Sequence, residues 1–177
     1  QGELPYLFKV LAAEHPLSLQ AHPSKRQAEF GFAKENTRGI PLSAKSRIYK
    51  DQNHKPELVC ALEPFEALYG FRDPFEAGQL LRILVRELGQ QGVRHQVAFG
   101  EAIASLDRGS SVDAMRCFLE MPQSLKGPLT KAAATASLRL PGDEFAWVSK
   151  LEAEYPGDVG SVISLLLNYV RLSPGEA

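Results

Sequence analysis

The chain has 177 residues, of which 44% are hydrophobic and 23% charged, and its formal net charge is −1 at pH 7. This length predicts one domain or slightly more, with enough residues for a sizeable core, and the composition is ordinary for a soluble globular protein. A net charge near zero argues against a nucleic-acid or membrane partner, and the apolar run at residues 162–167 is too short to span a bilayer.

The cysteines and the first residues bear on the compartment. Cys60 and Cys117 lie far apart in the sequence, each in apolar surroundings. This is typical of buried free thiols rather than of a disulfide framework. The start lacks the basic region and apolar core of a signal peptide, so we expect a cytoplasmic protein. Because the chain has no initiator Met and stops in a turn just begun, we also expect an internal fragment of a longer protein.

The first part of the chain is predicted to be extended. Residues 4–12 are aliphatic and aromatic, which favours a strand. Glu14 and His15 lie at the centre of a tight connection, and residues 17–23 are expected to form the returning strand. In that strand Ser18, Gln20 and His22 would leave one face, because side chains at i and i+2 point the same way.

A lysine inside the first predicted strand needs an explanation. In a symmetric hairpin Lys9 pairs opposite Gln20, on the face of the polar side chains, whereas a slip of one residue removes it from that face. An ammonium group among apolar residues is odd unless it has a use or a partner. A snorkelling lysine at a sheet edge explains the sequence equally well.

The next stretch combines a helix, a loop and further strands. Ser24 is expected to cap a helix, and residues 38–53 are polar and rich in turn residues, which predicts a long loop. Residues 58–62 are predicted to be a buried strand. Residues 65–71 are expected to be extended as well, although a helical turn is possible within them.

From residue 73 onward the sequence is predicted to be helical. Asp73 as N-cap, followed by Pro74, begins a helix with one apolar stripe at helical spacing, and Gly89 ends it. Short helices with short connections imply antiparallel packing. Further helices are expected after Ser110, over residues 123–137, 143–155 and 159–168, and then a strand begins.

Three side chains form a candidate set of metal ligands: the amide of Gln20, the imidazole of His22 and the carboxylate of Glu57. Such a mixed nitrogen and oxygen set is one that a divalent ion such as zinc accepts, and three protein ligands fit an open, catalytic site. On spacing alone, a surface or hydrogen-bonded pair is the commoner explanation of a Gln-x-His sequence.

Three motifs in this order resemble the type I phosphomannose isomerases. They are Gln-Ala-His-Pro-Ser-Lys, then Lys-Asp-Gln-Asn-His-Lys-Pro-Glu-Leu, then Pro-Phe-Glu-Ala-Leu-Tyr-Gly-Phe-Arg. The resemblance covers residues 4–72 by these motifs, and the later part only by its helical character. It implies an α+β fold, in which part of a cupin-type β jelly roll (residues 1–72) is followed by an inserted all-helical domain (residues 73–168) and a return to a cupin strand (residues 169–177).

The resemblance also implies a reaction and a metal. The family interconverts mannose 6-phosphate and fructose 6-phosphate through an enediol, with zinc as the Lewis acid. By motif, Gln20, His22 and Glu57 match the family's zinc ligands. The family's fourth ligand, a histidine, and a catalytic arginine have no match here, and His15 and His95 are poor substitutes. The fragment alone is therefore expected to be inactive.

The remaining site residues follow from the same resemblance. Lys9, His54 and Lys55 match positions implicated in catalysis, with His54 or Lys55 expected to move the proton. Ser18 and Lys25 are candidates for binding the phosphate or the sugar hydroxyls. A sugar phosphate is the expected small-molecule partner, and the protein is expected to be a monomer.

Two other functions stay open. A cupin oxygenase would use two histidines and a carboxylate for iron, and the Gln20 and His22 pair argues against it. A non-catalytic sugar-phosphate-binding cupin is the other alternative. The presence of both Lys55 and Glu57 argues against it, because a pure binding protein need not keep a candidate base beside a metal ligand.

Overall fold

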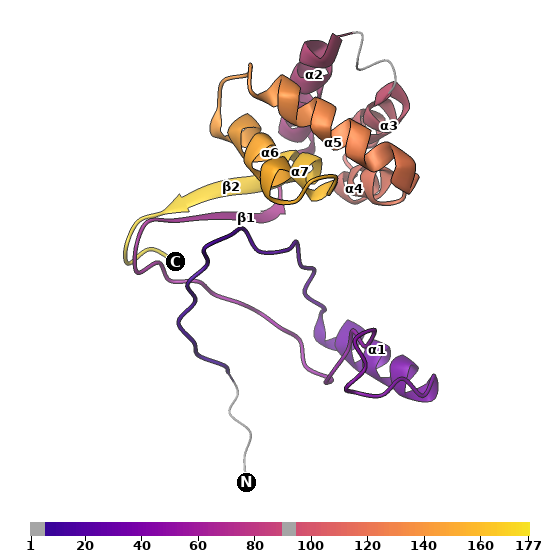
Figure 1. Cartoon of the computed structure of the whole chain (residues 1–177). Helices are drawn as coiled ribbons and strands as arrows, with labels where there is room; N and C mark the ends of the chain where they lie inside the picture. The colour runs from indigo at the N-terminus through magenta and orange to yellow at the C-terminus, as the bar shows by residue number, and fades with distance from the viewer. Residues whose placement is uncertain (1–5, 90–94) are drawn as a thin grey trace. The chain divides into compact units, whose positions relative to one another are not determined.

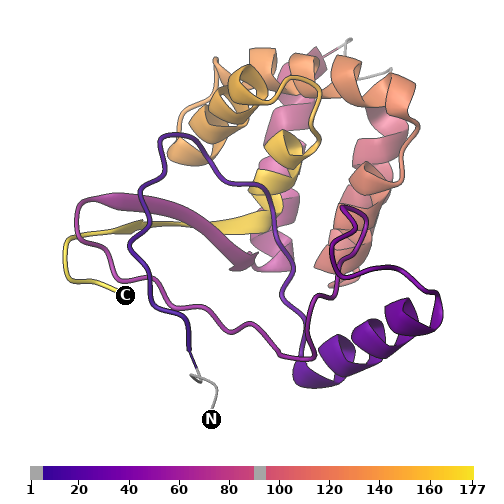
Figure 2. The same ribbon diagram turned by 60° about the horizontal axis from the view of Figure 1, so that its bottom comes forward.

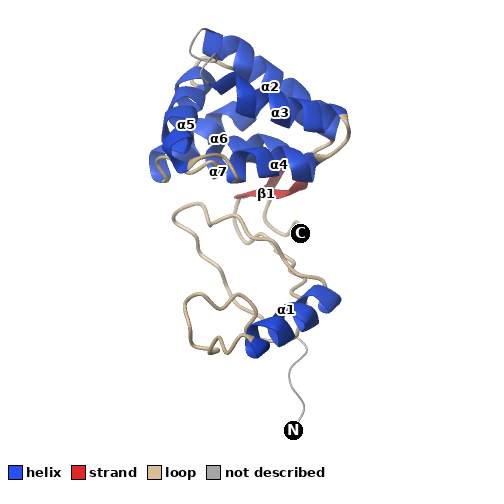
Figure 3. Ribbon diagram, turned by 90° about the vertical axis from the view of Figure 1, so that its right-hand side faces the viewer, coloured by secondary structure: helices blue, strands red, loops and turns tan. Residues whose placement is uncertain are grey.

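The computed structural model describes residues 6–89 and 95–177 and divides the chain into two compact units. The helical unit comprises Gln1–Leu17 and Pro64–Leu172, and the loop unit comprises Ser18–Glu63 and Ser173–Ala177. Figure 3 shows that helices dominate the first and that irregular backbone around one helix dominates the second. An α+β class is therefore confirmed. The described residues include no helix long and apolar enough to cross a membrane.

The helical unit is built from short helices around one apolar core (Figure 1). Phe99 and Phe118 meet edge to face in this core, with their ring centroids 5.7 Å apart, and both are almost fully buried. The helices are α2 (Pro74–Leu88), α3 (Gln96–Asp107), α4 (Ser111–Leu119), α5 (Gln123–Ser137), α6 (Asp143–Glu154) and α7 (Gly160–Ile163), followed by a 3₁₀ turn at Ser164–Leu166.

Local sequence signals explain where these helices begin and end. The side chain of Asp73 accepts hydrogen bonds from the backbone N–H groups of Phe75 and Glu76, which caps α2 as predicted. Gly89 ends α2 with a φ of +53°, a conformation that glycine adopts at little cost. Ser110 caps α4 in the same way by accepting from the N–H of Asp113.

A two-stranded antiparallel sheet joins the two ends of the helical segment (Figures 1 and 2). Strand β1 (Phe65–Phe71) pairs with β2 (Leu167–Leu172), and Phe65 lies opposite Leu172. The predicted extended stretch at 65–71 is thus confirmed, whereas the predicted helix over 159–168 is wrong beyond Leu166. Pairing with β1 supplies the backbone hydrogen bonds that the last residues would otherwise make within a helix.

The loop unit is organised by helix α1 (Lys25–Thr37) and the loop that follows it. Ser24 caps α1 as predicted, and the side chain of Gln27 accepts in turn from the N–H of Ser24, which completes a capping box. Gly31 lies directly under the ring of Tyr49: a Cβ atom at this glycine would collide with that ring. The loop therefore packs closely on α1.

The other predicted strands are wrong for the described residues. Residues 6–12, 17–23 and 58–60 have no regular secondary structure. A strand needs a neighbour for its N–H and C=O groups, and no other strand of the described chain lies beside these segments. The predicted buried strand at 58–62 is largely exposed, with Leu58 82% exposed, and only Ala61 is buried, where its backbone pairs with residues 175 and 176.

The cysteine prediction is correct in one respect only. Both cysteines are free, as expected, but Cys60 is exposed and Cys117 is half-buried. Cys60 is exposed because no strand of the described chain lies beside its segment. The jelly roll itself is likewise not seen among the described residues, whose strands form only the β1 and β2 pair.

Candidate functional site

Two of the three predicted metal ligands lie close together. Within the loop unit, His22 Nε2 is 3.7 Å from Glu57 Oε1, although the two residues belong to different motifs. That separation is too long for a hydrogen bond. Two donors at about 2.1 Å from a tetrahedral zinc ion lie about 3.4 Å apart. The imidazole and the carboxylate therefore need only a small adjustment to share one ion.

The third predicted ligand is an amide. Gln20 is exposed in the same irregular segment as His22. In the described part of the chain, no three His, Cys, Asp or Glu side chains are grouped so that they could hold a metal ion. A zinc site here therefore depends on Gln20 or on a further ligand. The donor types of Gln20, His22 and Glu57, an oxygen, a nitrogen and an oxygen, fit zinc.

Lys25, predicted to bind phosphate or sugar, connects α1 to the first part of the second motif, which spans residues 50–58. Its Nζ donates to the backbone carbonyl of Gln52 at 3.0 Å and to Oδ1 of Asn53 at 3.3 Å. Asn53 is fixed in turn, because its N–H donates to the Asp51 carboxylate at 2.8 Å. Lys25 thus orders the residues just before His54, a role that the sequence did not suggest.

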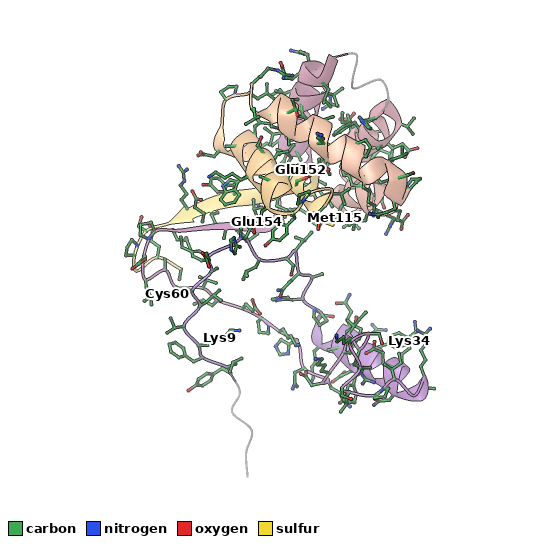
Figure 4. The ribbon with its side chains drawn as sticks, in the orientation of Figure 1. Lys9, Lys34, Cys60, Met115, Glu152 and Glu154 are labelled. Atoms are coloured by element: carbon green, nitrogen blue, oxygen red, sulfur yellow. The ribbon has the colours of Figure 1, made fainter. Side chains whose placement is uncertain are left out.

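The remaining predicted site residues are exposed. Ser18, His54 and Lys55 lie in irregular segments of the loop unit. Lys9 lies in the helical unit, in a segment without regular secondary structure (Figure 4). The hairpin that would have placed Lys9 opposite Gln20 is not formed in the described chain, so that prediction of register is wrong.

Sequence reasoning missed the buried ion pair that fixes the loop between the two motifs. Arg47 Nε lies 3.1 Å from Glu35 Oε2, and the Arg47 side chain is fully buried. Burial opposes ionisation of Glu35, but the N–H groups of Tyr49 and Ile48 and the Arg47 guanidinium outweigh it and hold its pKa below the ordinary value. A charged loop usually indicates solvated surface, so nothing in the sequence marked this pair.

The helical unit has a separate cavity of about 610 Å³ between α3, α4 and the start of α5. Apolar side chains line it together with polar ones, and the polar ones are His95, Glu101, Ser105, Asp113, Arg116 and Glu120. None of the predicted ligands or catalytic residues lines it. His95, which the sequence offered as a poor substitute ligand, thus belongs to a different part of the structure from Gln20 and His22.

Comparisons with known proteins confirm the resemblance to the type I phosphomannose isomerases. Residues 1–74 match a family model described as phosphomannose isomerase type I, catalytic domain. The chain is 41% identical over 176 residues to the mannose-6-phosphate isomerase of Salmonella typhimurium. The aligned region covers 99% of this chain and 43% of that protein. It is 34% identical over 186 residues to mannose-6-phosphate isomerase 1 of Arabidopsis thaliana, covering 99% of this chain and 40% of the relative.

Solved structures give the same result. The crystal structure of the Salmonella typhimurium enzyme bound to substrate and a zinc atom matches with a TM-score of 0.77 and 36% identity, over 93% of this chain and 40% of that one. A zinc-bound mannose 6-phosphate isomerase matches with a TM-score of 0.76 and 38% identity, again over 93% and 40%. The chain thus spans less than half the length of the relatives it matches.

Proposed function

We propose that this chain carries part of the active site of a zinc-dependent mannose-6-phosphate isomerase, an aldose–ketose isomerase that interconverts mannose 6-phosphate and fructose 6-phosphate. One observation carries the proposal: His22 and Glu57, from two separate motifs, come within 3.7 Å of each other. It is supported by similarity over almost the whole chain to enzymes of this name, and by the substrate and zinc in a related structure.

In this proposal Gln20, His22 and Glu57 hold the zinc ion. When bound, zinc supplies a Lewis acid that stabilises negative charge on a sugar oxygen during the isomerisation. Lys55 is separated from Glu57 only by Pro56, which biases Lys55 toward an extended backbone, so both side chains can lie on one face. This places Lys55 beside a bound ion.

Proton transfer between C2 and C1 of the sugar is assigned to Lys55 or His54, with Lys9 as a further catalytic residue. A lysine acts as a base only when a neighbouring positive charge or burial favours its neutral form. Ser18 is assigned to the phosphate or the sugar hydroxyls. Lys25 either shares that role or acts through its contacts with Gln52 and Asn53.

The proposal extends to the fold around the site. Large apolar side chains are exposed in the unpaired segments: Tyr6, Leu7, Phe8, Val10, Leu17, Leu19, Leu58 and Leu62. In a cupin jelly roll completed by further strands, these residues would be covered, and a downstream histidine would complete the metal site. We include a monomeric state and a cytoplasmic location in the same proposal.

A coupled isomerase assay tests the proposal. The 177-residue chain is compared with a protein continued to the length of the relatives, each before and after removal of metal by a chelator. Activity on mannose 6-phosphate in the longer protein, lost on chelation and restored by zinc, is the expected result. Sugar-phosphate binding without turnover by the longer protein, loaded with zinc, would contradict it and favour the non-catalytic cupin.

A further inference from the structure

The end of helix α6 holds residues 15 and 16 by two polar contacts within the helical unit. The Tyr155 hydroxyl donates to the backbone carbonyl of Pro16 at 2.5 Å. His15 Nδ1 lies 3.0 Å from Glu154 Oε1, and Figure 4 marks Glu154 where α6 approaches the N-terminal segment. Two neighbouring residues of one helix end thus hold two neighbouring residues of a segment that has no regular secondary structure.

The turn that carries Tyr155 is itself fixed. Tyr155 closes α6 by donating its N–H to the carbonyl of Leu151 at 2.8 Å. The carboxylate of Glu152 accepts from the N–H of Gly157, with distances of 3.1 and 3.2 Å to its two oxygens. Gly157 has a φ of +82°, which a residue with a Cβ rarely adopts, so the turn depends on this glycine.

The other end of α6 is attached to the sheet. Arg171 of β2 lies 3.2 Å from the carboxylate of Asp143, the first residue of α6. Arg72, just after β1, lies 3.5 Å from Glu144. The 12 residues of α6 rise about 18 Å in a regular helix. Helix α6 thus connects the β1 and β2 pair to residues 15 and 16.

We propose that Tyr155 and Glu154 are positioning residues for the metal-ligand segment that begins at Ser18, a role that rests on the proposed function. Gln20 is four residues beyond Pro16, a reach of at most about 14 Å along an extended backbone. Holding Pro16 removes conformations of the following residues before a metal arrives. Less entropy is then lost when Gln20 and His22 converge on the ion, and affinity rises.

The test compares Tyr155→Phe with Tyr69→Phe in the 177-residue chain. Tyr155→Phe deletes one hydroxyl. Tyr69 is 63% exposed in the same unit, and its hydroxyl makes no hydrogen bond with the described residues, so Tyr69→Phe is a matched control. Two quantities are measured: backbone ¹⁵N order parameters of residues 17–22 without metal, and the Zn²⁺ dissociation constant by competition with a chromophoric chelator.

In Tyr155→Phe we expect the order parameters of Leu17 and Ser18 to fall below about 0.6, the range of flexible backbone. The Zn²⁺ dissociation constant is expected to rise about two- to tenfold, the equivalent of one hydrogen bond. Tyr69→Phe is expected to change neither quantity. Unchanged order parameters and zinc affinity in Tyr155→Phe would overturn the positioning role and leave the proposed function intact.

A second variant guards against a folding defect. His15→Ala removes the partner of Glu154 from the exposed segment and leaves the helices untouched, so it is used if Tyr155→Phe lowers the melting temperature of the helical unit. The same loss of order and of zinc affinity is expected. If the unaltered protein, also at the length of the relatives, binds no Zn²⁺, the proposed function fails, whereas the order parameters still decide whether α6 orders the segment.

Discussion

The buried guanidinium of Arg47 offers the sharpest test of how the loop unit is held together. Its side chain donates to the backbone carbonyls of Tyr49 at 2.6 Å and Ile40 at 2.8 Å, and to Oδ1 of Asn36 at 2.8 Å. It also neutralises Glu35 at 3.1 Å. The loop between the two site motifs is thus tied to α1 at several points by one side chain.

Replacing Arg47 by Met keeps an unbranched apolar stem and removes the charge and the donors. Three hydrogen bonds from a charged group, at about 1.5 kcal/mol each or slightly more, amount to about 5 kcal/mol. This agrees with the cost of about 3–5 kcal/mol for removing one partner of a buried ion pair. A loss of this size is a large fraction of the stability of any small domain. The loop is therefore expected to detach from α1.

Amide hydrogen exchange at Ile48 and Tyr49 measures this detachment directly, because both N–H groups donate to the Glu35 carboxylate. In Arg47→Met their exchange is expected to accelerate about a thousandfold, since each 1.4 kcal/mol corresponds to a factor of about ten. Lys45→Met, which removes an exposed charge from the same loop, is the control and should leave exchange unchanged. Protection within about tenfold of the unaltered chain in Arg47→Met would refute the reasoning.

Three further predictions concern the core, the pH dependence and the reaction. Phe118→Ala should lower the free energy of unfolding of the helical unit by about 3–5 kcal/mol in urea titrations, whereas Leu138→Ala, at a site 76% exposed, should not; equal midpoints would contradict the buried position of Phe118. The hydrogen bond from Tyr169 holds the pKa of Glu66 below its ordinary value of 4.5. As the pH falls, Glu66 is therefore protonated in the unfolded chain before it is protonated in the folded chain. The stabilisation that ionised Glu66 provides is complete above about pH 4.5 and is lost as the pH falls through the lower pKa of the folded state. Tyr169→Phe should weaken that acid dependence in urea titrations from about pH 7 to about pH 3, and an unaltered dependence would exclude this hydrogen bond as its cause. In a protein of the relatives' length, Lys55→Ala should lower turnover by orders of magnitude while zinc stays bound, and near-normal turnover would exclude Lys55 as the base.

Local signals in the sequence were enough to predict the boundaries of α2. Asp73 and Gly89 delimit α2 because a capping carboxylate and a positive φ act within a few residues. The apolar stripe between them predicted the buried face for the same reason. The candidate metal ligands Gln20, His22 and Glu57 could also be proposed from the sequence, because each lies in a short contiguous motif.

Only the tertiary structure decided what depends on a distant partner. Strand β2 forms at Leu167 because β1, far earlier in the chain, lies beside it, whereas residues 17–23 resemble a strand in sequence but find no neighbour in the described chain. The burial of Arg47 and the contact of Tyr155 with Pro16 were equally invisible in the sequence. A cap or a stripe is satisfied within a few residues, but a sheet hydrogen bond or a buried charge needs a group that only folding brings near.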